Sequence, residues 1–472
     1  MLFSQHIDTV LLHIWRKTMT GDMTKDNVFK SLIRFTGPLI LSGLLQQLYY
    51  ITDSVIVGNY VGELGLAAVG VSSPIFYVFI YIISGLVSGY TILLSHFYGA
   101  REYDKVSKLT NTFVLFIMIS ACIISAVGLA VKDSILVMLS TPVEVLQAGS
   151  EYLAITLLGV PFLVLYNLFG SMLRAIGDSK TPLYGIILSS IANIILDLVL
   201  INVFGLGVKG AAVATVIAQM AAGAYLGIFI YRRHSMFRIS LRADQRDIAL
   251  FSDSLKLGVP RVIQSTIASV GHLLLQNIMN SFGVDVVTAI TTAYKIDALT
   301  MLPLVNISAA ISIFVGQNIG AKNPERAEEG LKTGVILAAV WSIAVTFFVV
   351  SLGETMMKIF GVSAQVAAIG GRFFRTCAVF YPIFGLHNAY LGFLQGAKDV
   401  VFASSCSIIA LSVRVLLSYT LASSLGSDVI AVSEICSWIV GAAICFVRYR
   451  NGRWKKLSGL ETVRSIPAKL AH

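Results

Sequence analysis

The stretch FYGAREYDKVSK, residues 97–108, returns 221 residues later as NIGAKNPERAEEG, residues 318–330. Earlier in each copy, FTGPLI and LGVPRV align with a shift of 222, which pairs Pro38 with Pro260. The shift of 221 gives further identical pairs, namely Gly99 with Gly320, Pro161 with Pro382, Asn167 with Asn388, Leu173 with Leu394 and Asp178 with Asp399. Agreement over so long a span indicates that the chain holds two copies of one structural unit.

The composition around these repeats is typical of a protein embedded in a membrane. Hydrophobic residues make up 56% of the 472 residues and charged residues 13%, whereas about a quarter of a soluble domain is charged. Apolar stretches of the roughly 20 residues needed to cross a bilayer recur along the chain. They predict twelve spans, near residues 31–58, 65–95, 107–131, 146–174, 180–203, 208–231, 251–280, 285–316, 330–352, 366–393, 400–422 and 428–448.

The predicted spans form two sets of six, separated by a basic linker. An even number of spans returns each set to the same side, so both copies have the same orientation. We therefore expect an all-α polytopic membrane protein in which two six-helix bundles are related by a pseudo-twofold axis along the membrane normal. The expected divisions are an N-terminal extension (1–24), an N-lobe (25–231), a linker (232–250), a C-lobe (251–450) and a basic tail (451–472).

The distribution of basic residues predicts the orientation. Most of the 35 Lys and Arg residues fall in the segments on the side of the two termini. The exceptions are Lys132, Lys209, Lys358, Arg372 and Arg375 on the opposite side, and Arg261, Lys295 and Arg414 inside spans. This asymmetry places both termini in the cytoplasm of a plasma-membrane protein. It also explains the net charge of +10 through loops that face anionic lipid, without a nucleic-acid partner.

Residues 1–22 carry no signal-peptide cleavage pattern. Two interpretations of this segment are open. It forms a short amphipathic helix on the membrane surface, or it is a dispensable extension upstream of a translation start at Met23.

The motif inventory argues against an enzyme. No GxxxxGK[ST] phosphate-binding loop occurs, and no soluble segment is long enough to carry catalysis. The five cysteines (Cys122, Cys377, Cys406, Cys436 and Cys445) lie in apolar runs without metal-type spacing, so we interpret them as buried small hydrophobic residues. No cofactor or bound metal is expected. Interfaces between such repeats are where transporters often bind their substrates, and without nucleotide hydrolysis the energy for transport comes from an ion gradient, a partner or the substrate's own gradient.

Polar residues inside the N-lobe spans indicate an ion site. In SSIANIILDLVL, residues 189–200, Asn193 and Asp197 share one helix face at i, i+4. Asp53 and Thr215 come from two other spans of the same bundle. A carboxylate in hydrocarbon costs about 2.5–3.5 kcal/mol or more, and the C-lobe copy manages without these groups, since Leu275, Arg414 and Ser418 occupy the positions of Asp53, Asn193 and Asp197.

These four side chains predict a cation- or proton-binding site. Hard oxygen donors suit a small cation such as Na⁺, and neighbouring carboxylates favour the uptake of one proton. The alternative is that the four groups join helices through hydrogen bonds.

Further polar residues inside spans are candidates to line a substrate cavity, namely Gln46, Asn167, Gln276, Lys295, Asp297, Asn388 and Arg414. For Asp297 and Arg414, a mutual ion pair is an equally good interpretation. Lys295 and Asp297 are two residues apart and so point to different helix faces. His272 and His387 have no third ligand at metal spacing and are interpreted as core residues, and Glu434 is expected to be solvated near a helix end.

The two first-span prolines, Pro38 and Pro260, each remove a backbone hydrogen bond. A purely structural kink would explain either one alone. Their duplicated position favours a shared role as conformational hinges between the lobes.

Taken together, TGPLI and GVPRV, TDSVIVG, GAREYDKV and GAKNPERA, LRAIGDSKTP, and NIILDLVLINVFGLGVKGAAVAT resemble the MATE family of multidrug and toxic compound extrusion exporters. The resemblance covers roughly residues 25–450. It implies a bacterial secondary antiporter that exchanges H⁺ or Na⁺ for organic, often cationic and amphipathic compounds. It also implies a cation site at Asp53, Asn193, Asp197 and Thr215.

One departure from the family pattern concerns the C-lobe. Some branches place a glutamate in the seventh span, but no carboxylate lies between Pro260 and Phe282 here. Lys295 and Arg414 keep open the alternative of a flippase or exporter for lipid-linked or anionic substrates. A receptor or scaffold without transport would leave the duplicated halves unexplained. The expected partners are small organic molecules and membrane lipids, and the expected functional unit is a monomer.

Overall fold

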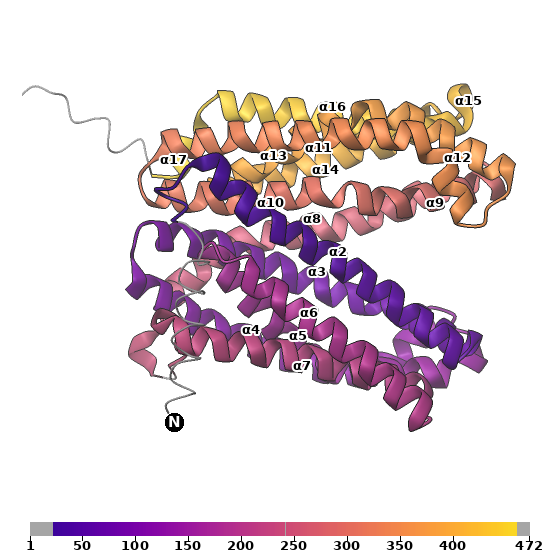
Figure 1. The fold of residues 1–472 in the computed structure, drawn as a ribbon, viewed down its shortest axis with the longest axis horizontal. Helices are drawn as coiled ribbons and strands as arrows, with labels where there is room; N and C mark the ends of the chain where they lie inside the picture. The colour runs from indigo at the N-terminus through magenta and orange to yellow at the C-terminus, as the bar shows by residue number, and fades with distance from the viewer. Residues whose placement is uncertain (1–21, 241, 460–472) are drawn as a thin grey trace, which may run out of the picture.

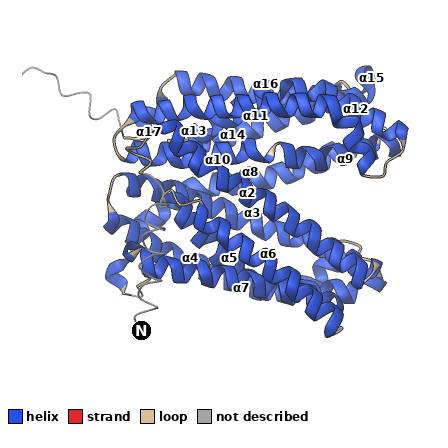
Figure 2. Cartoon of the chain, in the orientation of Figure 1, coloured by secondary structure: helices blue, strands red, loops and turns tan. Residues whose placement is uncertain are grey.

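The computed structural model describes residues 22–240 and 242–459, and all regular structure in these residues is helical (Figure 2). Nearly all of the predicted N-terminal extension and most of the basic tail lie outside the described residues. The predicted surface helix of residues 1–22 therefore stays a prediction.

The N-lobe consists of α2 (Val28–Tyr60), α3 (Glu63–Gly99), α4 (Tyr103–Met138), α5 (Val143–Ala175), α6 (Lys180–Asp197), a π-helix η1 (Leu198–Val203) and α7 (Gly207–Arg233). Two short 3₁₀ turns, η2 (Ser235–Phe237) and η3 (Ala243–Gln245), lie in the linker. The C-lobe consists of α8 (Ile248–Asn280), α9 (Val284–Thr300), α10 (Leu302–Gly320), α11 (Pro324–Ile359), α12 (Ala364–Cys377), η4 (Ala378–Phe380), α13 (Tyr381–Gly396), α14 (Val400–Thr420), α15 (Ala422–Leu425), η5 (Gly426–Asp428) and α16 (Val429–Arg450). The short α17 (Arg453–Leu457) follows.

The predicted twelve-span organisation is confirmed, with two interrupted spans in the C-lobe. Within the described chain, 11 helical segments are long and apolar enough to cross a membrane, and the 33-residue α8 is long enough but more polar. The predicted span 285–316 is divided into α9 and α10 just before Pro303, and the span 366–393 is divided into α12 and α13 just before Pro382. Proline lacks an amide hydrogen and is favoured in the first turn of a helix, which explains both restarts.

The two lobes lie side by side and diverge toward one end (Figure 1). The beginning of α2 and the short α17 lie at the opposite end, where the lobes meet. We call the end with the described termini the closed end and the other the open end.

Glycines bring the lobes into backbone contact at the closed end. A Cβ atom on Gly99 of α3 would overlap the backbone carbonyl of Gln317, and one on Gly320 of α10 would overlap the carbonyl of His96. The two glycines are partners in the internal repeat, so each lobe offers the same small surface to the other. Such close approach favours helix association in membranes, where van der Waals packing replaces the hydrophobic effect.

Two hydrogen bonds accompany this contact and obey the repeat. His96 Nε2 lies 2.7 Å from the carbonyl oxygen of Gly396, and Gln317 Nε2 donates to the carbonyl oxygen of Ala175 over 2.7 Å. The two bonds are equivalent by the repeat, because the shift of 221 pairs His96 with Gln317 and Ala175 with Gly396. Because both donors are buried, these bonds join the lobes away from water.

Helix α2 begins against the C-lobe and ends in the N-lobe (Figure 1). Its first turns, including Leu32 and Phe35, pack on Phe314 of α10, whereas Val57 packs within the N-lobe. Pro38 lies near the end of the C-lobe contact, which continues to Leu39 and to Gly43 beside Leu302. The proline is therefore placed where a bend would move the open-end half of α2 relative to its closed-end half.

Helix α8 makes the complementary crossing. Its first turn brings Phe251 onto the rings of Phe113 and Phe116 in the N-lobe, whereas Gly271 contacts Leu411 of α14 in the C-lobe. Pro260 lies between the two contacts. The predicted hinge prolines thus occupy equivalent crossing points, and their role as hinges stays a prediction.

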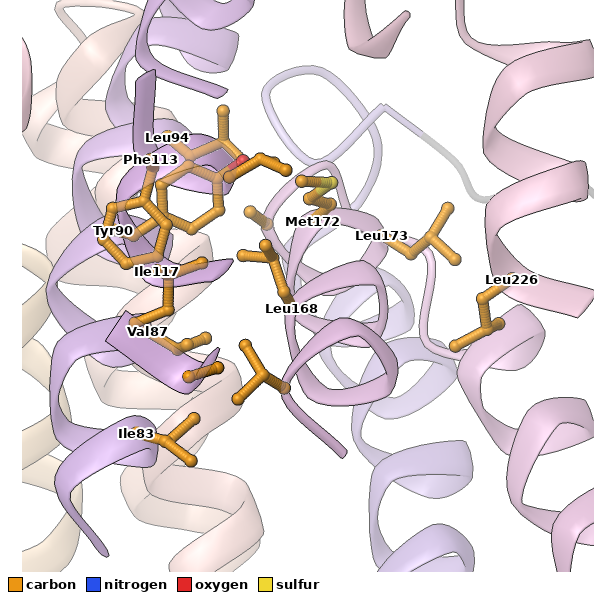
Figure 3. Close-up of a cluster of buried hydrophobic side chains, with 14 of the residues drawn as sticks. Ile83, Val87, Tyr90, Leu94, Phe113, Ile117, Leu168, Met172, Leu173 and Leu226 are labelled. Carbon is orange, nitrogen blue, oxygen red and sulfur yellow. The ribbon is translucent and has the colours of Figure 1, made fainter. Parts of the chain in front are cut away.

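The N-lobe core lies between α3, α4 and α5 (Figure 3). Tyr90 stacks on Phe113 with ring centroids 4.5 Å apart, and its hydroxyl group lies 2.9 Å from that of Thr110. Leu168 and Met172 of α5 face this pair. The core thus holds α3, α4 and α5 together, while α6 packs mainly on α2 and α7.

Candidate functional site

The structure brings the N-lobe acidic residues together. Asp53 of α2 meets Asn193 and Asp197 of α6, and the three side chains lie close enough to interact with one another. Asp53 is 8% exposed, and Asn193 and Asp197 are completely buried. The i, i+4 spacing of the α6 pair therefore does place both residues on one inward face.

The cluster is short of partners. Asp53 Oδ1, both carboxyl oxygens of Asp197 and both amide atoms of Asn193 are buried without a hydrogen bond to any residue that the structure describes. Over residues 22–240 and 242–459, neither carboxyl group forms an ion pair with a basic side chain. Buried polar atoms are nearly always hydrogen-bonded, and an unpaired buried charge is expensive. The arrangement therefore fits a site for a small cation or a proton.

A change of helix type follows the cluster directly. The α-helical hydrogen-bonding pattern of α6 ends at Asp197 and continues as the π-helix Leu198–Val203. Single π-helical turns are rare and occur frequently at functional sites. The sequence does not reveal this irregularity, because the segment is as apolar as the turns before it.

Thr215 and Asp53 line a common cavity of about 100 Å³ in the N-lobe. The hydroxyl group of Tyr49 donates to Thr215 Oγ1 over 3.4 Å. A cavity of about 300 Å³ also lies at the closed end beside Lys30 and Arg34, and it contains none of the predicted site residues. The smaller cavity is the one that adjoins the acidic cluster.

Other polar residues of the smaller cavity escaped the sequence analysis. Tyr49, Tyr152, Thr156 and Gln219 contribute to its lining. Tyr49 precedes Asp53 by four residues and Gln219 follows Thr215 by four residues. Helical spacing from the predicted residues would have found these two, whereas Tyr152 and Thr156 come from α5 and required the fold.

The buried charges of the C-lobe are paired. Arg414 of α14 forms an ion pair of 2.9 Å with Glu434 of α16 and donates to the hydroxyl group of Tyr294 over 2.7 Å. Glu434 is 9% exposed, so the expectation that it is solvated was wrong. The packing of α14 on α16 brings the two side chains together and excludes water from them.

Asp297 has different partners from those expected. Its Oδ1 accepts a hydrogen bond of 2.6 Å from the hydroxyl group of Tyr381 and lies 3.5 Å from Thr300 Oγ1. The expected ion pair between Asp297 and Arg414 is not formed, because Glu434 occupies the guanidinium group. Lys295 is exposed and forms no ion pair within the described residues, and its predicted place in a substrate cavity stays a prediction.

The remaining predicted cavity residues bind their own helices. Asn167 and Asn388, which are partners in the repeat, each donate to the carbonyl oxygen four residues earlier over 2.9 Å. Gln46 donates to the hydroxyl group of Tyr50 over 3.4 Å, and Gln276 donates to Asn280 Oδ1 over 2.8 Å. None of these contacts joins the acidic cluster, and their role in substrate binding stays a prediction.

Comparisons with known proteins agree with the duplicated fold. A family model described as MatE matches residues 38–199 and 260–420, two stretches that begin at the paired prolines Pro38 and Pro260. The chain is 29% identical over 439 residues to the probable multidrug resistance protein YpnP of Bacillus subtilis, a match that covers 92% of this chain and 98% of that protein. It is 24% identical over 445 residues to the probable multidrug resistance protein NorM of Thermotoga maritima, covering 92% of this chain and 95% of that protein.

Solved structures share the same fold. A multidrug resistance MATE family transporter of the MOP superfamily in an outward-facing conformation aligns with a TM-score of 0.86 at 23% identity, over 93% of this chain and 98% of that one. A MOP superfamily transporter from Pyrococcus furiosus, described as having a binding pocket of reverse polarity that suggests a different function, aligns with a TM-score of 0.86 at 23% identity. That match covers 94% of this chain and 99% of that one.

Proposed function

Because the chain belongs to the MatE family of multidrug efflux transporters, we propose that it is an antiporter that exports organic, cationic amphipathic compounds in exchange for H⁺ or Na⁺. The observation that carries this proposal is the buried, unpartnered acidic cluster of Asp53, Asn193 and Asp197 beside the N-lobe cavity. Two buried carboxyl groups without a basic side chain beside them are stabilised when a proton or a small cation binds to them.

We place the protein in a bacterial plasma membrane with both termini in the cytoplasm. The distribution of Lys and Arg supports this orientation, and the closed end then faces the cytoplasm. The lobes meet at that end through Gly99 and Gly320. On this assignment the conformation is open to the outside, from where an ion moving down its gradient enters.

Helix α2 provides the mechanical link in this proposal. Asp53 lies in its open-end half, beyond Pro38, and the closed-end half packs on the C-lobe. Binding of H⁺ or Na⁺ removes the repulsion between Asp53 and Asp197 and draws α2 and α6 together. The N-lobe cavity changes shape as α2 bends at Pro38, so the substrate affinity differs between the ion-bound and ion-free states. This difference in affinity is all that coupling requires.

The test is export in proteoliposomes that contain a fluorescent organic cation. Transport is driven by a pH gradient in one set and by a Na⁺ gradient in the other, which also identifies the ion. We expect Asp53→Asn and Asp197→Asn to abolish gradient-driven transport while the protein remains folded. Asp104→Asn, the same chemical change at an exposed position of α4, is the matched control. Gradient-driven transport at the wild-type rate in Asp197→Asn would remove the cluster from the mechanism.

Transport of an anionic or lipid-linked substrate is the second candidate, favoured by the exposed Lys295, which has no ion-pair partner in the described chain. Arg414 supports it less, because Glu434 neutralises this side chain. Replacement Lys295→Gln separates the candidates. It should abolish export of an anionic substrate and leave export of a cation unchanged or faster.

A further inference from the structure

Three metal-ligand side chains converge inside the C-lobe, away from the acidic cluster. They are His387 of α13, Cys406 of α14 and Cys445 of α16, and one ligand atom from each lies within 4.8 Å of the other two. Their exposed fractions are 8%, 1% and 0%. The three residues are far apart in the chain, so only the packing of three helices brings them together.

The present hydrogen bonds of this cluster are weak. The Cys445 thiol lies 3.2 Å from Cys406 Sγ, and the Cys406 thiol donates to the carbonyl oxygen of Gly441 over 3.4 Å. Thiols are weak donors, so little is lost if a metal ion replaces their protons. His387 Nδ1 is buried without a hydrogen-bond partner among the described residues.

Gly441 makes room for the imidazole ring. A Cβ atom at this position would lie 2.7 Å from His387 Cε1, so any other residue on this face of α16 would push the ring away from the thiols. The glycine thus allows the His387 ring to pack against α16 at Gly441. Cys406 contacts the carbonyl group of the same residue.

We propose that His387, Cys406 and Cys445 form a binding site for one thiophilic metal ion, with Zn²⁺ as the best match in charge. Binding of Zn²⁺ by a neutral imidazole and two thiols releases two protons and leaves a site without net charge. Neutrality is decisive in a membrane interior, where an uncompensated charge is costly. Histidine nitrogen and cysteine sulfur are the ligands that zinc prefers.

The distances allow this coordination after small side-chain rotations. Two thiolate sulfurs that each lie about 2.3 Å from one tetrahedral zinc ion are roughly 3.8 Å apart. The two Sγ atoms here are 3.2 Å apart and need to separate by only about half an ångström to meet that geometry. His387 also lines a cavity of about 210 Å³. Neither cysteine lines this cavity, so it approaches the proposed site only from the side of the imidazole ring.

The N-lobe lacks this site. At the repeat shift of 221, Tyr166, Gly185 and Ala224 occupy the positions of His387, Cys406 and Cys445. The fold therefore does not require these ligands, and their convergence is a particular feature of the C-lobe. A bound ion there would tie α13, α14 and α16 into one rigid unit. The proposal does not depend on the transport function.

The experiment measures zinc in purified, reduced, full-length protein after removal of any affinity tag. The protein is incubated with Zn²⁺ and desalted, and the bound metal is counted by mass spectrometry. We expect one zinc ion per chain in the wild type and in Cys377→Ser, which removes a buried thiol of α12. We expect loss of that ion in Cys406→Ser and Cys445→Ser.

A second measurement keeps the proposal testable if those variants fail to fold. Cys406 and Cys445 are buried in the folded protein, so their alkylation is followed in mild denaturant, where Zn²⁺ should slow it in the wild type and leave the rate at Cys436 unchanged. Retention of no zinc by the wild type, equal binding by Cys406→Ser, or a Cys406–Cys445 disulfide that persists after reduction would each overturn the proposal.

Discussion

The two lobes share one architecture but treat the buried carboxyl groups within their membrane-spanning helices in opposite ways. In the N-lobe, Asp53 and Asp197 have no basic partner within the described residues, and most of their oxygen atoms form no hydrogen bond. In the C-lobe, Glu434 forms an ion pair with Arg414, and Asp297 accepts a hydrogen bond from Tyr381. These groups do not lie on equivalent helices, because the internal repeat pairs α2 and α6 with α8 and α14, whereas Asp297 lies on α9 and Glu434 on α16.

This difference indicates which carboxyl groups bind an ion and which stabilise the fold. A carboxyl group with permanent partners stabilises one arrangement of helices, because those partners offset the cost of burial. For a carboxyl group without partners, the cost of burial is not offset until an ion binds. The stability of the conformation that buries it therefore depends on the ion concentration. The N-lobe is therefore the half that responds to an ion, and the C-lobe is the half that holds its shape.

The largest expected effect comes from the same chemical change made in each lobe. Glu434→Gln leaves Arg414 buried without a counter-charge and should lower the free energy of unfolding by about 3–5 kcal/mol. Asp197→Asn removes a charge that has no partner and should leave that free energy equal or higher. Denaturation of the purified proteins in detergent compares the two.

The double variant Arg414→Met/Glu434→Leu serves as the control for the ion pair. It should recover most of the lost stability, because replacing both partners by apolar residues removes the unpaired charge. Equal destabilisation by Glu434→Gln and Asp197→Asn would erase the distinction between the lobes.

A smaller effect is expected from two tyrosine hydroxyl groups. Tyr381→Phe removes the 2.6 Å hydrogen bond to Asp297, and hydrogen bonds to charged groups contribute about 1.5–3 kcal/mol. Tyr49→Phe removes only the 3.4 Å contact with Thr215 and should cost well under 1 kcal/mol on the same scale. Thermal unfolding of both variants provides the comparison, and a larger loss for Tyr49→Phe would contradict it.

Equivalent substitutions in the two lobes should have equal effects at the closed end, unlike substitutions of the acidic residues. Gly99→Ala and Gly320→Ala each place a methyl group against a backbone carbonyl of the other lobe. Overpacking of this kind costs about 1–3 kcal/mol, and both variants should shift the lobes toward the conformation that is open at this end. Gly37→Ala is the matched control, because nothing lies within 4 Å of its Cβ position.

Spin-label distances across the closed end measure this shift. Similar increases for Gly99→Ala and Gly320→Ala, with none for Gly37→Ala, are expected. A shift in only one of the two glycine variants would show that the repeat does not extend to the contact between the lobes.

The sequence predicted the features that depend on periodicity and on the cost of burial. The repeat of Gly99 at Gly320 indicated two equivalent halves, and hydropathy located the spans. Asp53, Asn193 and Asp197 could be singled out because ionisable residues in apolar segments are rare and usually functional. Their helical spacing was enough to predict that two of them share a face.

Other contacts depend on how neighbouring helices are rotated about their axes. The order of residues along the chain does not reveal this rotation. The sequence analysis offered Asp297 as the partner of Arg414, and only the packing of α14 on α16 reveals that Glu434 takes this place. Likewise, the approach of His387 to Cys406 and Cys445 requires three helices at once. Neither outcome leaves a local signal in the sequence.

The most direct test of the account measures the ion released when substrate binds to the purified protein. A pH indicator in weakly buffered solution follows H⁺, and radioactive sodium follows Na⁺. The account predicts that an organic cation displaces one of these ions from the wild type and from Glu434→Gln, but not from Asp53→Asn/Asp197→Asn. Release of the same amount of ion from the double variant would contradict the claim that the unpartnered N-lobe carboxyl groups carry the coupling ion.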